Sequence, residues 1–260
     1  MPSVLLYVLG IVGCAAVLIY LMLIFPTQWV KTVRMKRPLG LGKRIVQVSD
    51  MHVERLRIGP KRLRKLIVAE QPDYIFLTGD YTENSKYIAR VSRYLEEFKK
   101  VGVPIYAILG NHDYRLMEHF YELAEAFEQF EIPLLRNESV QLDGFTLVGI
   151  DDEDAGLANP TLALQKVKPH DKVIILAHNP NVTLKIYHSY SYMMCGHFHG
   201  RQFRLPFIFH LKNKGPLPRQ GIYEGAHRNR WGEFYISRGI GQSELNARFL
   251  IRSEFTVHDL

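Results

Sequence analysis

The hydrophobic pattern of the chain opens with an apolar run that contains no charged residue. Residues 3–25 read SVLLYVLGIVGCAAVLIYLMLIF, which is 23 residues. As an α-helix this run would reach about 34 Å, enough to cross a hydrocarbon core of about 30 Å. Pro26 follows the run, and Trp29 lies where an interfacial aromatic residue is expected. The pattern therefore predicts one N-terminal transmembrane anchor within residues 1–30.

Two processed forms of this segment compete with an uncleaved anchor. A signal peptide would have Lys or Arg before the apolar run, a shorter run and a small-residue cleavage site, and this sequence has none of the three. The segment Ile11-Val12-Gly13-Cys14 resembles a lipoprotein processing box, but Cys14 lies in the middle of the run. The uncleaved anchor is the favoured interpretation.

Beyond residue 44 the pattern changes to short apolar runs and amphipathic segments. Val- and Ile-rich runs predict strands, and apolar residues spaced three and four apart predict helices. Strands are expected over 44–49, 73–78, 104–109, 145–150, 173–177, 190–195 and 233–237, and helices over 60–70, 84–101 and 114–130. Strands and helices alternate in the first half, and strands dominate the second. This order predicts a single mixed α/β layered domain over residues 45–260.

Charge is distributed unevenly along the chain. The 33 Lys and Arg residues exceed the 26 Asp and Glu residues, which gives a net charge of +7. Residues 1–44 contain six basic residues and no acidic one, so residues 45–260 are almost neutral. The basic composition therefore does not indicate a nucleic-acid partner. It predicts a basic juxtamembrane linker over 31–44, which would attract anionic lipids and place the domain in the cytoplasm by the positive-inside rule.

Composition excludes several other classes. Hydrophobic residues make up 47% of the chain and charged residues 23%, so a disordered chain or a coiled coil is excluded. Cys14 and Cys195 are the two cysteines, and Cys14 lies in the apolar run. A disulfide framework is therefore excluded as well.

Residues typical of metal ligands follow five of the predicted strands. The clusters are Asp50-Met51-His52, Gly79-Asp80, Gly110-Asn111-His112-Asp113, His178-Asn179 and Gly196-His197-Phe198-His199-Gly200. Ligands of α/β sheets converge at the carboxyl ends of the strands, so these clusters are expected to share one crevice. The alternative is that the Asp residues are turn residues and that the Gly-His-Phe-His-Gly run is a β-turn. That alternative requires five independent coincidences.

The ordered set D-x-H, G-D, G-N-H-D, H and G-H-x-H resembles the calcineurin-like metallophosphoesterases. The resemblance covers about residues 44–255 and is greatest to small bacterial members with an N-terminal membrane helix. Two later blocks, QFRLPF over 202–207 and SRGIG over 237–241, support it. The resemblance implies a four-layer α/β/β/α sandwich preceded by one transmembrane helix.

The resemblance also implies a site for two metal ions. Asp80 would bridge them, with Asp50, His52 and His199 on one ion and Asn111, His178 and His197 on the other. Imidazole with carboxylate or amide oxygen suits Mn, Fe or Zn better than Mg, and Mn is the first choice. Two such ions would lower the pKa of a water molecule and produce the attacking hydroxide. In this comparison His112 is the acid for the leaving group, Asp113 orients its ring and keeps it cationic, and Gly110 allows close backbone approach.

Two residues depart from the common family pattern. Phe198 stands where a small residue is frequent, and it is expected to narrow the pocket. Arg201 stands where Gly is frequent. Its guanidinium is a candidate for binding a substrate phosphate or head group, and an arginine that only faces solvent is an equal alternative.

Two further segments have both a functional and a structural interpretation. The apolar stretch over 203–211 could touch the bilayer or receive acyl chains, but a loop packed on the core is favoured. The acidic run over 151–154 could hold another cation, but a solvated turn is favoured.

Together these features predict a membrane-anchored, cytoplasm-facing, dinuclear phosphoesterase. Its substrate would carry a phosphodiester or phosphoanhydride, and location at a membrane favours a phospholipid or lipid-linked compound. One alternative is a broad phosphomonoesterase or phosphodiesterase that acts on soluble compounds. The other is a non-catalytic, metal-containing membrane scaffold. Because all seven ligand positions and His112 are present, catalysis is favoured over the scaffold.

Overall fold

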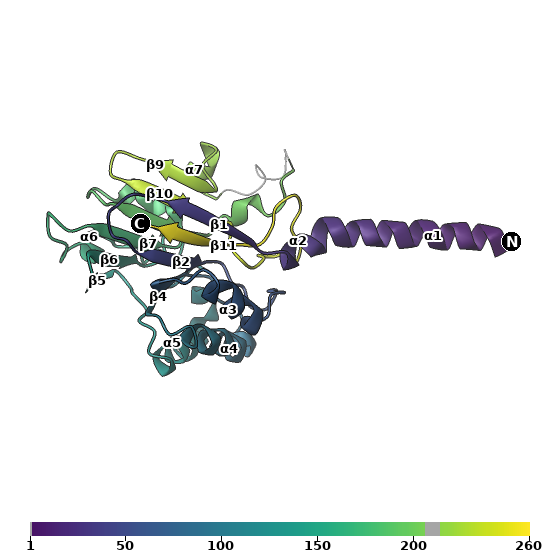
Figure 1. Ribbon diagram of the computed structural model, residues 1–260, viewed down its shortest axis with the longest axis horizontal. Helices are drawn as coiled ribbons and strands as arrows, with labels where there is room; N and C mark the ends of the chain where they lie inside the picture. The colour runs from purple at the N-terminus through teal and green to yellow at the C-terminus, as the bar shows by residue number, and fades with distance from the viewer. Residues whose placement is uncertain (1, 206–213) are drawn as a thin grey trace.

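Two mixed β-sheets form the centre of the domain in a computed structural model that describes residues 2–205 and 214–260 (Figure 1). The first sheet has the strand order β1-β11-β2-β3-β4, and the second has the order β5-β6-β7-β8-β10-β9. The first sheet contains β1 (Lys31–Lys36), β2 (Arg44–Val48), β3 (Tyr74–Thr78), β4 (Ile105–Ile108) and β11 (Glu254–Asp259). The second contains β5 (Glu138–Leu142), β6 (Phe145–Ile150), β7 (Val173–Ala177), β8 (Tyr192–Cys195), β9 (Gly225–Arg228) and β10 (Glu233–Ile236).

Helices cover the outer faces of the two sheets. The first sheet is covered by α3 (Pro60–Val68), α4 (Ile88–Lys99) and α5 (Phe120–Gln129), which lie together in Figure 1. The second is covered by α6 (Pro160–Ala163), α7 (Pro216–Arg219) and the 3₁₀ helix η4 (Pro180–Lys185). One apolar core lies between the sheets, and one lies beneath each helical layer. This α/β/β/α order confirms the predicted fold class.

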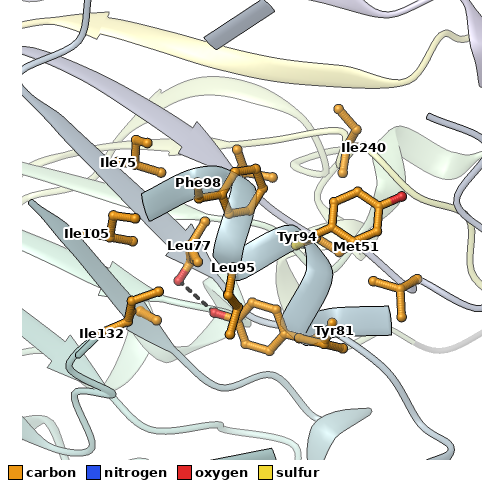
Figure 2. Close-up of a cluster of buried hydrophobic side chains, with 14 of the residues drawn as sticks. Met51, Ile75, Leu77, Tyr81, Tyr94, Leu95, Phe98, Ile105, Ile132 and Ile240 are labelled. Atoms are coloured by element: carbon orange, nitrogen blue, oxygen red, sulfur yellow. Dashed lines mark hydrogen bonds between the residues drawn. The ribbon is translucent and has the colours of Figure 1, made fainter. Parts of the chain in front are cut away.

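The amphipathic pattern explains how α4 packs. Val91, Leu95 and Phe98 are fully buried because a spacing of three and four places them on one face. Figure 2 shows Leu95 and Phe98 in the cluster that also contains Ile75 and Leu77 of β3. These contacts fix the helical layer on the strands whose ends carry the candidate ligands.

The sequence-based prediction does not include four strands that contain polar or charged residues. Strands β1, β5, β9 and β11 were not predicted, and residues 31–36 of the expected linker form β1, paired in parallel with β11. Lys31, Arg34 and Lys36 of β1 are exposed, while Val33 and Met35 pack against the core between the sheets. In β11 the polar residues Glu254 and His258 are buried, so the usual alternation of apolar and polar positions is absent.

The predicted helix over 114–130 is divided. A 3₁₀ segment, η3 (Asp113–His119), precedes α5, and Met117 interrupts it with a φ of 53°. A non-glycine residue with positive φ breaks the helical hydrogen-bond pattern. The helix therefore begins at Phe120.

The N-terminal helix projects from the domain (Figure 1). It consists of α1 (Pro2–Ile19), a π-helical segment η1 (Tyr20–Ile24) and α2 (Phe25–Gln28). The span Val4–Gln28 is long and apolar enough to cross a membrane. Its described side chains are largely exposed as far as Met22, whereas Thr27 is fully buried against the domain.

Replacing Phe76 with Ala is expected to destabilise the domain by about 3–5 kcal/mol. Phe76 is fully buried in the core between the two sheets, where its ring lies 6.2 Å from that of Tyr106. Urea unfolding of the full chain in detergent would measure the loss. Tyr121→Ala is the control because Tyr121 is 75% exposed. Equal midpoints for the two variants would contradict the packing of the sheets through Phe76.

Candidate metal centre

Five strand ends deliver the seven predicted ligands to one place. Two of these ends belong to the second sheet, so the site lies where the carboxyl ends of both sheets meet. Asp50 and His52 follow β2, Asp80 follows β3, Asn111 follows β4, His178 follows β7, and His197 and His199 follow β8. Asn111 is half-buried, and the other six are buried.

The first group of ligands combines Asp50, His52, Asp80 and His199. Each offers one ligand atom, and these atoms all lie within 4.8 Å of one another. His199 Nε2 lies 3.4 Å from Asp50 Oδ1, and His52 Nε2 lies 3.4 Å from Asp80 Oδ2. Two imidazoles and two carboxylates at this spacing form a compact set suited to a divalent cation.

The second group combines Asp80, His178 and His197, again within 4.8 Å. His178 Nε2 lies 3.1 Å from Asp80 Oδ2. Asn111 joins this group, because its Oδ1 lies 3.0 Å from His197 Nδ1. Asp80 belongs to both groups, and its position between them is that of a bridging carboxylate.

Buried ring nitrogens support the fit of cations to these groups. His178 Nδ1 lies 2.8 Å from the carbonyl oxygen of Thr78. Because a carbonyl only accepts, Nδ1 carries the hydrogen and Nε2 is left for a ligand. His178 Nε2 is one of several buried ring nitrogens of the site that have no hydrogen-bond partner among the described residues. Such atoms are costly unless an ion or water satisfies them.

Electrostatics of the site also favour positive charge beside Asp80. Desolvation alone would raise the pKa of Asp80, but the charge of the neighbouring His178, helped by His52, holds it well below its ordinary value. Desolvation alone would lower the pKa of His178, but Asp80 raises it well above its ordinary value. A divalent cation would supply the same positive charge to the Asp80 carboxylate.

Desolvation lowers the pKa of His197 to about 4 and that of His199 well below its ordinary value. Both rings are therefore neutral near pH 7. Neutral imidazole is the form that ligates metal ions.

The backbone is strained where the ligands are attached. Non-glycine residues rarely adopt positive φ, and clusters of them occur at functional sites. Five of the seven ligands do so: Asp50 (φ 55°), His52 (39°), Asp80 (59°), His197 (75°) and His199 (51°). Gly110 allows close approach, since a Cβ there would lie 2.3 Å from Asp80 Oδ1.

His112 lies beside the first group, but its ring is held by Glu83 and not by Asp113. The rings of His112 and His52 meet edge to face, with centroids 4.7 Å apart. His112 Nδ1 lies 2.7 Å from Glu83 Oε2, a contact that the sequence did not predict. Desolvation lowers the pKa of His112 to about 4, and the hydrogen bond with Glu83 acts against that shift.

The expected role of Asp113 is therefore corrected. Its carboxylate accepts backbone N–H groups of Asp80 (2.9 Å), Tyr81 (2.7 Å) and Gly110 (2.9 Å). The side chain thus joins the loops that follow β3 and β4. It holds the backbone at the candidate ligand Asp80, whereas the His112 ring is bonded by Glu83.

The interpretation of the acidic run over 151–154 as a solvated turn holds for only part of it, where the Asp154 side chain is 48% exposed. Asp151 and Asp152 are buried, and Asp152 has a pKa raised to about 6 by desolvation. Asp154 Oδ2 lies 3.2 Å from His197 Nε2, and its Oδ1 accepts a hydrogen bond from Asn179 at 2.8 Å. The run follows β6, so it lies at the carboxyl end of a strand, as the five predicted ligand clusters do.

The remaining predicted positions lie at the edge of the site. The Arg201 guanidinium is stacked on the Tyr223 ring, 3.5 Å from its centroid. Phe198 is 3% exposed and belongs to the core beneath the second sheet, so it does not narrow a pocket as expected. Phe203 forms an isolated bridge with Phe249. The rest of the apolar stretch, from 206 to 211, lies outside the described residues.

Replacing Asp154 with Asn is expected to weaken metal binding at the second group. An acidic group beside a ligating histidine helps to fix its ring and tune its basicity, and loss of such outer partners typically costs 10–100-fold in metal affinity. The Asp154 carboxylate lies 3.2 Å from His197 Nε2. Competition with a chelator, followed by elemental analysis, would measure the change. Asp143→Asn is the control because the Asp143 side chain is 82% exposed. Equal affinities in the two variants would contradict the role given to Asp154.

The comparisons with known proteins agree with this geometry. The model of the calcineurin-like phosphoesterase family matches residues 43–201. The chain therefore belongs to the calcineurin-like phosphoesterase family and is a metal-dependent phosphoester hydrolase with a divalent dimetal site. It is 34% identical to the uncharacterized metallophosphoesterase YkoQ of Bacillus subtilis, over 89% of this chain and 90% of that protein.

Two other relatives carry names that describe an activity. The chain is 29% identical to the phosphodiesterase YaeI of Escherichia coli, over 84% of this chain and 82% of that protein. It is 28% identical to the UDP-2,3-diacylglucosamine pyrophosphatase LpxG of Chlamydia muridarum, over 77% of this chain and 78% of that protein.

Proposed function

We propose that this hydrolase is anchored in the cell membrane by its N-terminal helix and cleaves a phosphodiester or phosphoanhydride bond of a lipid-borne substrate at the cytoplasmic face. The observation that carries the proposal is how the helix joins the domain. Leu23 and Pro26 accept backbone hydrogen bonds from Arg248 (2.9 Å) and Ser253 (3.1 Å). Arg57 also donates to the hydroxyl of the buried Thr27 at 3.1 Å. The apolar helix is thus a fixed extension of the domain.

The substrate class is supported by location and by the relatives. A hydrolase held at a membrane meets lipid-borne substrates at a raised local concentration. LpxG is named a pyrophosphatase of a diacylated sugar nucleotide, and YaeI is named a phosphodiesterase. The basic residues that follow the helix support a cytoplasmic orientation. Nothing described in the structure favours the scaffold alternative.

In the proposed reaction each residue has a defined task. Asp50, His52, Asp80 and His199 would hold one divalent cation, and Asp80, Asn111, His178 and His197 the other. Bound cations of this kind, with Mn ahead of Fe or Zn, supply Lewis acidity and lower the pKa of water. His112 would donate a proton to the leaving oxygen from its cationic form, which the charge of Asp80 and the hydrogen bond with Glu83 stabilise against desolvation. Arg201 would bind a non-bridging phosphate oxygen or a head group.

Removing residues 1–22 is expected to abolish a preference for acylated substrate. The cut leaves Leu23 and Thr27, which bond to the domain, in place. The full chain in nanodiscs should hydrolyse an acylated phosphodiester about 10²-fold faster than the truncated form does, since anchoring raises the effective concentration. Both forms should hydrolyse the matched deacylated diester equally. Unchanged turnover of the acylated compound after truncation would favour soluble substrates.

A further inference from the structure

Two leucines are exposed in the loop that precedes β11. Leu245 and Leu250 are each 64% exposed, within the segment 243–250, which we call the 243–250 loop. A soluble surface usually covers or scatters such side chains. Here both belong to one short loop.

The 243–250 loop lies against the base of the N-terminal helix. The Arg248 N–H donates to the carbonyl oxygen of Leu23 at 2.9 Å, and in Figure 1 the yellow-green loop runs beside α2. Arg252, just beyond the loop, stacks on the half-exposed Trp29 with its guanidinium 3.6 Å from the ring centroid. Trp is enriched at membrane–water interfaces, and a guanidinium over its face is attracted by the ring. The loop therefore stands where the apolar helix leaves the domain.

The same loop is tied to the wall of the metal centre. Gln202, three residues after the ligand His199, donates to the carbonyl oxygens of Ser243 (3.0 Å) and Leu245 (2.6 Å). The fully buried guanidinium of Arg248 donates to the carbonyl oxygens of Gly239 (3.0 Å) and Gly241 (2.6 Å).

The glycines that Arg248 holds lie directly against a ligand. A Cβ on Gly239 would lie 2.7 Å from Cβ of Asp50. Arg248 therefore connects the base of the helix to the loops that carry the ligands.

The backbone of the 243–250 loop is strained next to one exposed leucine and at the other. Leu250 has a φ of 56° and Glu244 a φ of 58°. Glycine adopts this left-handed conformation readily, whereas a residue with a side chain does so only at a cost in conformational energy. A bulky leucine kept exposed at such a position indicates that the side chain has a use at the surface.

We propose that the 243–250 loop rests in the interfacial region of a phospholipid bilayer, with Leu245 and Leu250 among the upper acyl segments. The loop would then hold the metal centre at the membrane surface, so that a lipid head group reaches the ligands without leaving the bilayer. Continuity of the loop with the apolar helix selects the bilayer as the occupant. The inference rests on the proposed membrane anchoring and deepens it by assigning a second contact with lipid.

Depth-dependent fluorescence quenching tests the proposal on the full chain. The protein would be reconstituted into vesicles of phosphatidylethanolamine and phosphatidylglycerol that carry nitroxide lipids. An environment-sensitive probe would be attached to Leu245→Cys or Leu250→Cys in a Cys14→Ser background, where Cys195 is buried and unreactive. Tyr121→Cys provides the matched control, because Tyr121 is 75% exposed on α5. The native Cys14 provides a separate probe of the helix.

We expect nitroxides near the head groups to quench the probes at Leu245 and Leu250, and to leave the probe at Tyr121 unquenched. Cys14 should be quenched by nitroxides near the chain ends. Quenching at Cys14 together with unquenched probes at both leucines would overturn the loop contact and leave the anchor in place. An unquenched probe at Cys14 would overturn the proposed anchoring, and the inference with it.

Discussion

Replacing Asp80 with Asn is expected to lower kcat/KM by at least about 10²–10³-fold, the range seen when one electrostatic stabiliser of a transition state is removed. The reason is that Asp80 is common to both ligand groups, with Oδ2 lying 3.4 Å from His52 Nε2 and 3.1 Å from His178 Nε2. An amide keeps the size of the side chain but removes the negative charge between the two cations. Elemental analysis should show fewer than two ions per chain.

The assay would compare a chromogenic phosphodiester with its matched monoester, first without metal and then with Mn, Zn or Mg. Asp143→Asn is the control, since it removes the same charge from an exposed position whose pKa is lowered chiefly by its hydrogen bond with Lys43. Full turnover by Asp80→Asn with two bound ions would contradict the bridging role. Turnover lost with both ions retained would assign Asp80 to substrate activation alone.

The predicted ligands lie together because strand ends converge. Asp50 and Asp80 follow two parallel strands of the first sheet, and His178 follows a parallel strand of the second, so the site forms where the carboxyl ends of the two sheets meet. Hydrophobic runs located those strands reliably. The ligand groups follow from topology and not from local sequence.

Contacts across the site could not be predicted in the same way. Adjacency in the chain suggested that Asp113 orients His112, but Asp113 points to the backbone N–H groups of the loop after β3. Glu83 belongs to that same loop, and its contact with His112 spans 29 positions. A carboxylate at the end of an irregular loop has no periodic pattern that would reveal its partner.

Buried polar residues limited the prediction of the fold. Strand β11 was missed because Glu254 and His258 face the interior, where they bond to Tyr235 and Gln47. Arg248 is fully buried although arginine is rarely so, and its partners are backbone carbonyls that any sequence provides. The attachment of the helix to the metal centre therefore became visible only in the structure.

His112→Ala is expected to reduce turnover according to the leaving group. A general acid contributes about 10²–10⁴-fold when the leaving oxygen is a strongly basic alkoxide. A nitrophenolate leaves readily without protonation, so its release should be affected much less. His112 contacts the ligand groups through the edge of its ring and through its backbone N–H, which donates to Asp80 Oδ1 at 2.9 Å. Because alanine keeps that N–H, the variant should keep both metal ions. Rates for a series of diesters with leaving groups of increasing pKa would measure the difference.

Glu83→Gln separates orientation of the ring from proton donation. Glu83 lies 2.7 Å from His112 Nδ1 and also accepts from Arg115 at 2.7 Å. The glutamine amide keeps an oxygen near the ring but removes a charge that helps to raise the pKa of His112. Turnover should therefore lie between that of the wild type and that of His112→Ala. His119→Ala is the control, because His119 pairs with Glu122 at the surface.

A loss of equal size for alkoxide and nitrophenolate substrates in His112→Ala would show that His112 positions the substrate and does not protonate the leaving group.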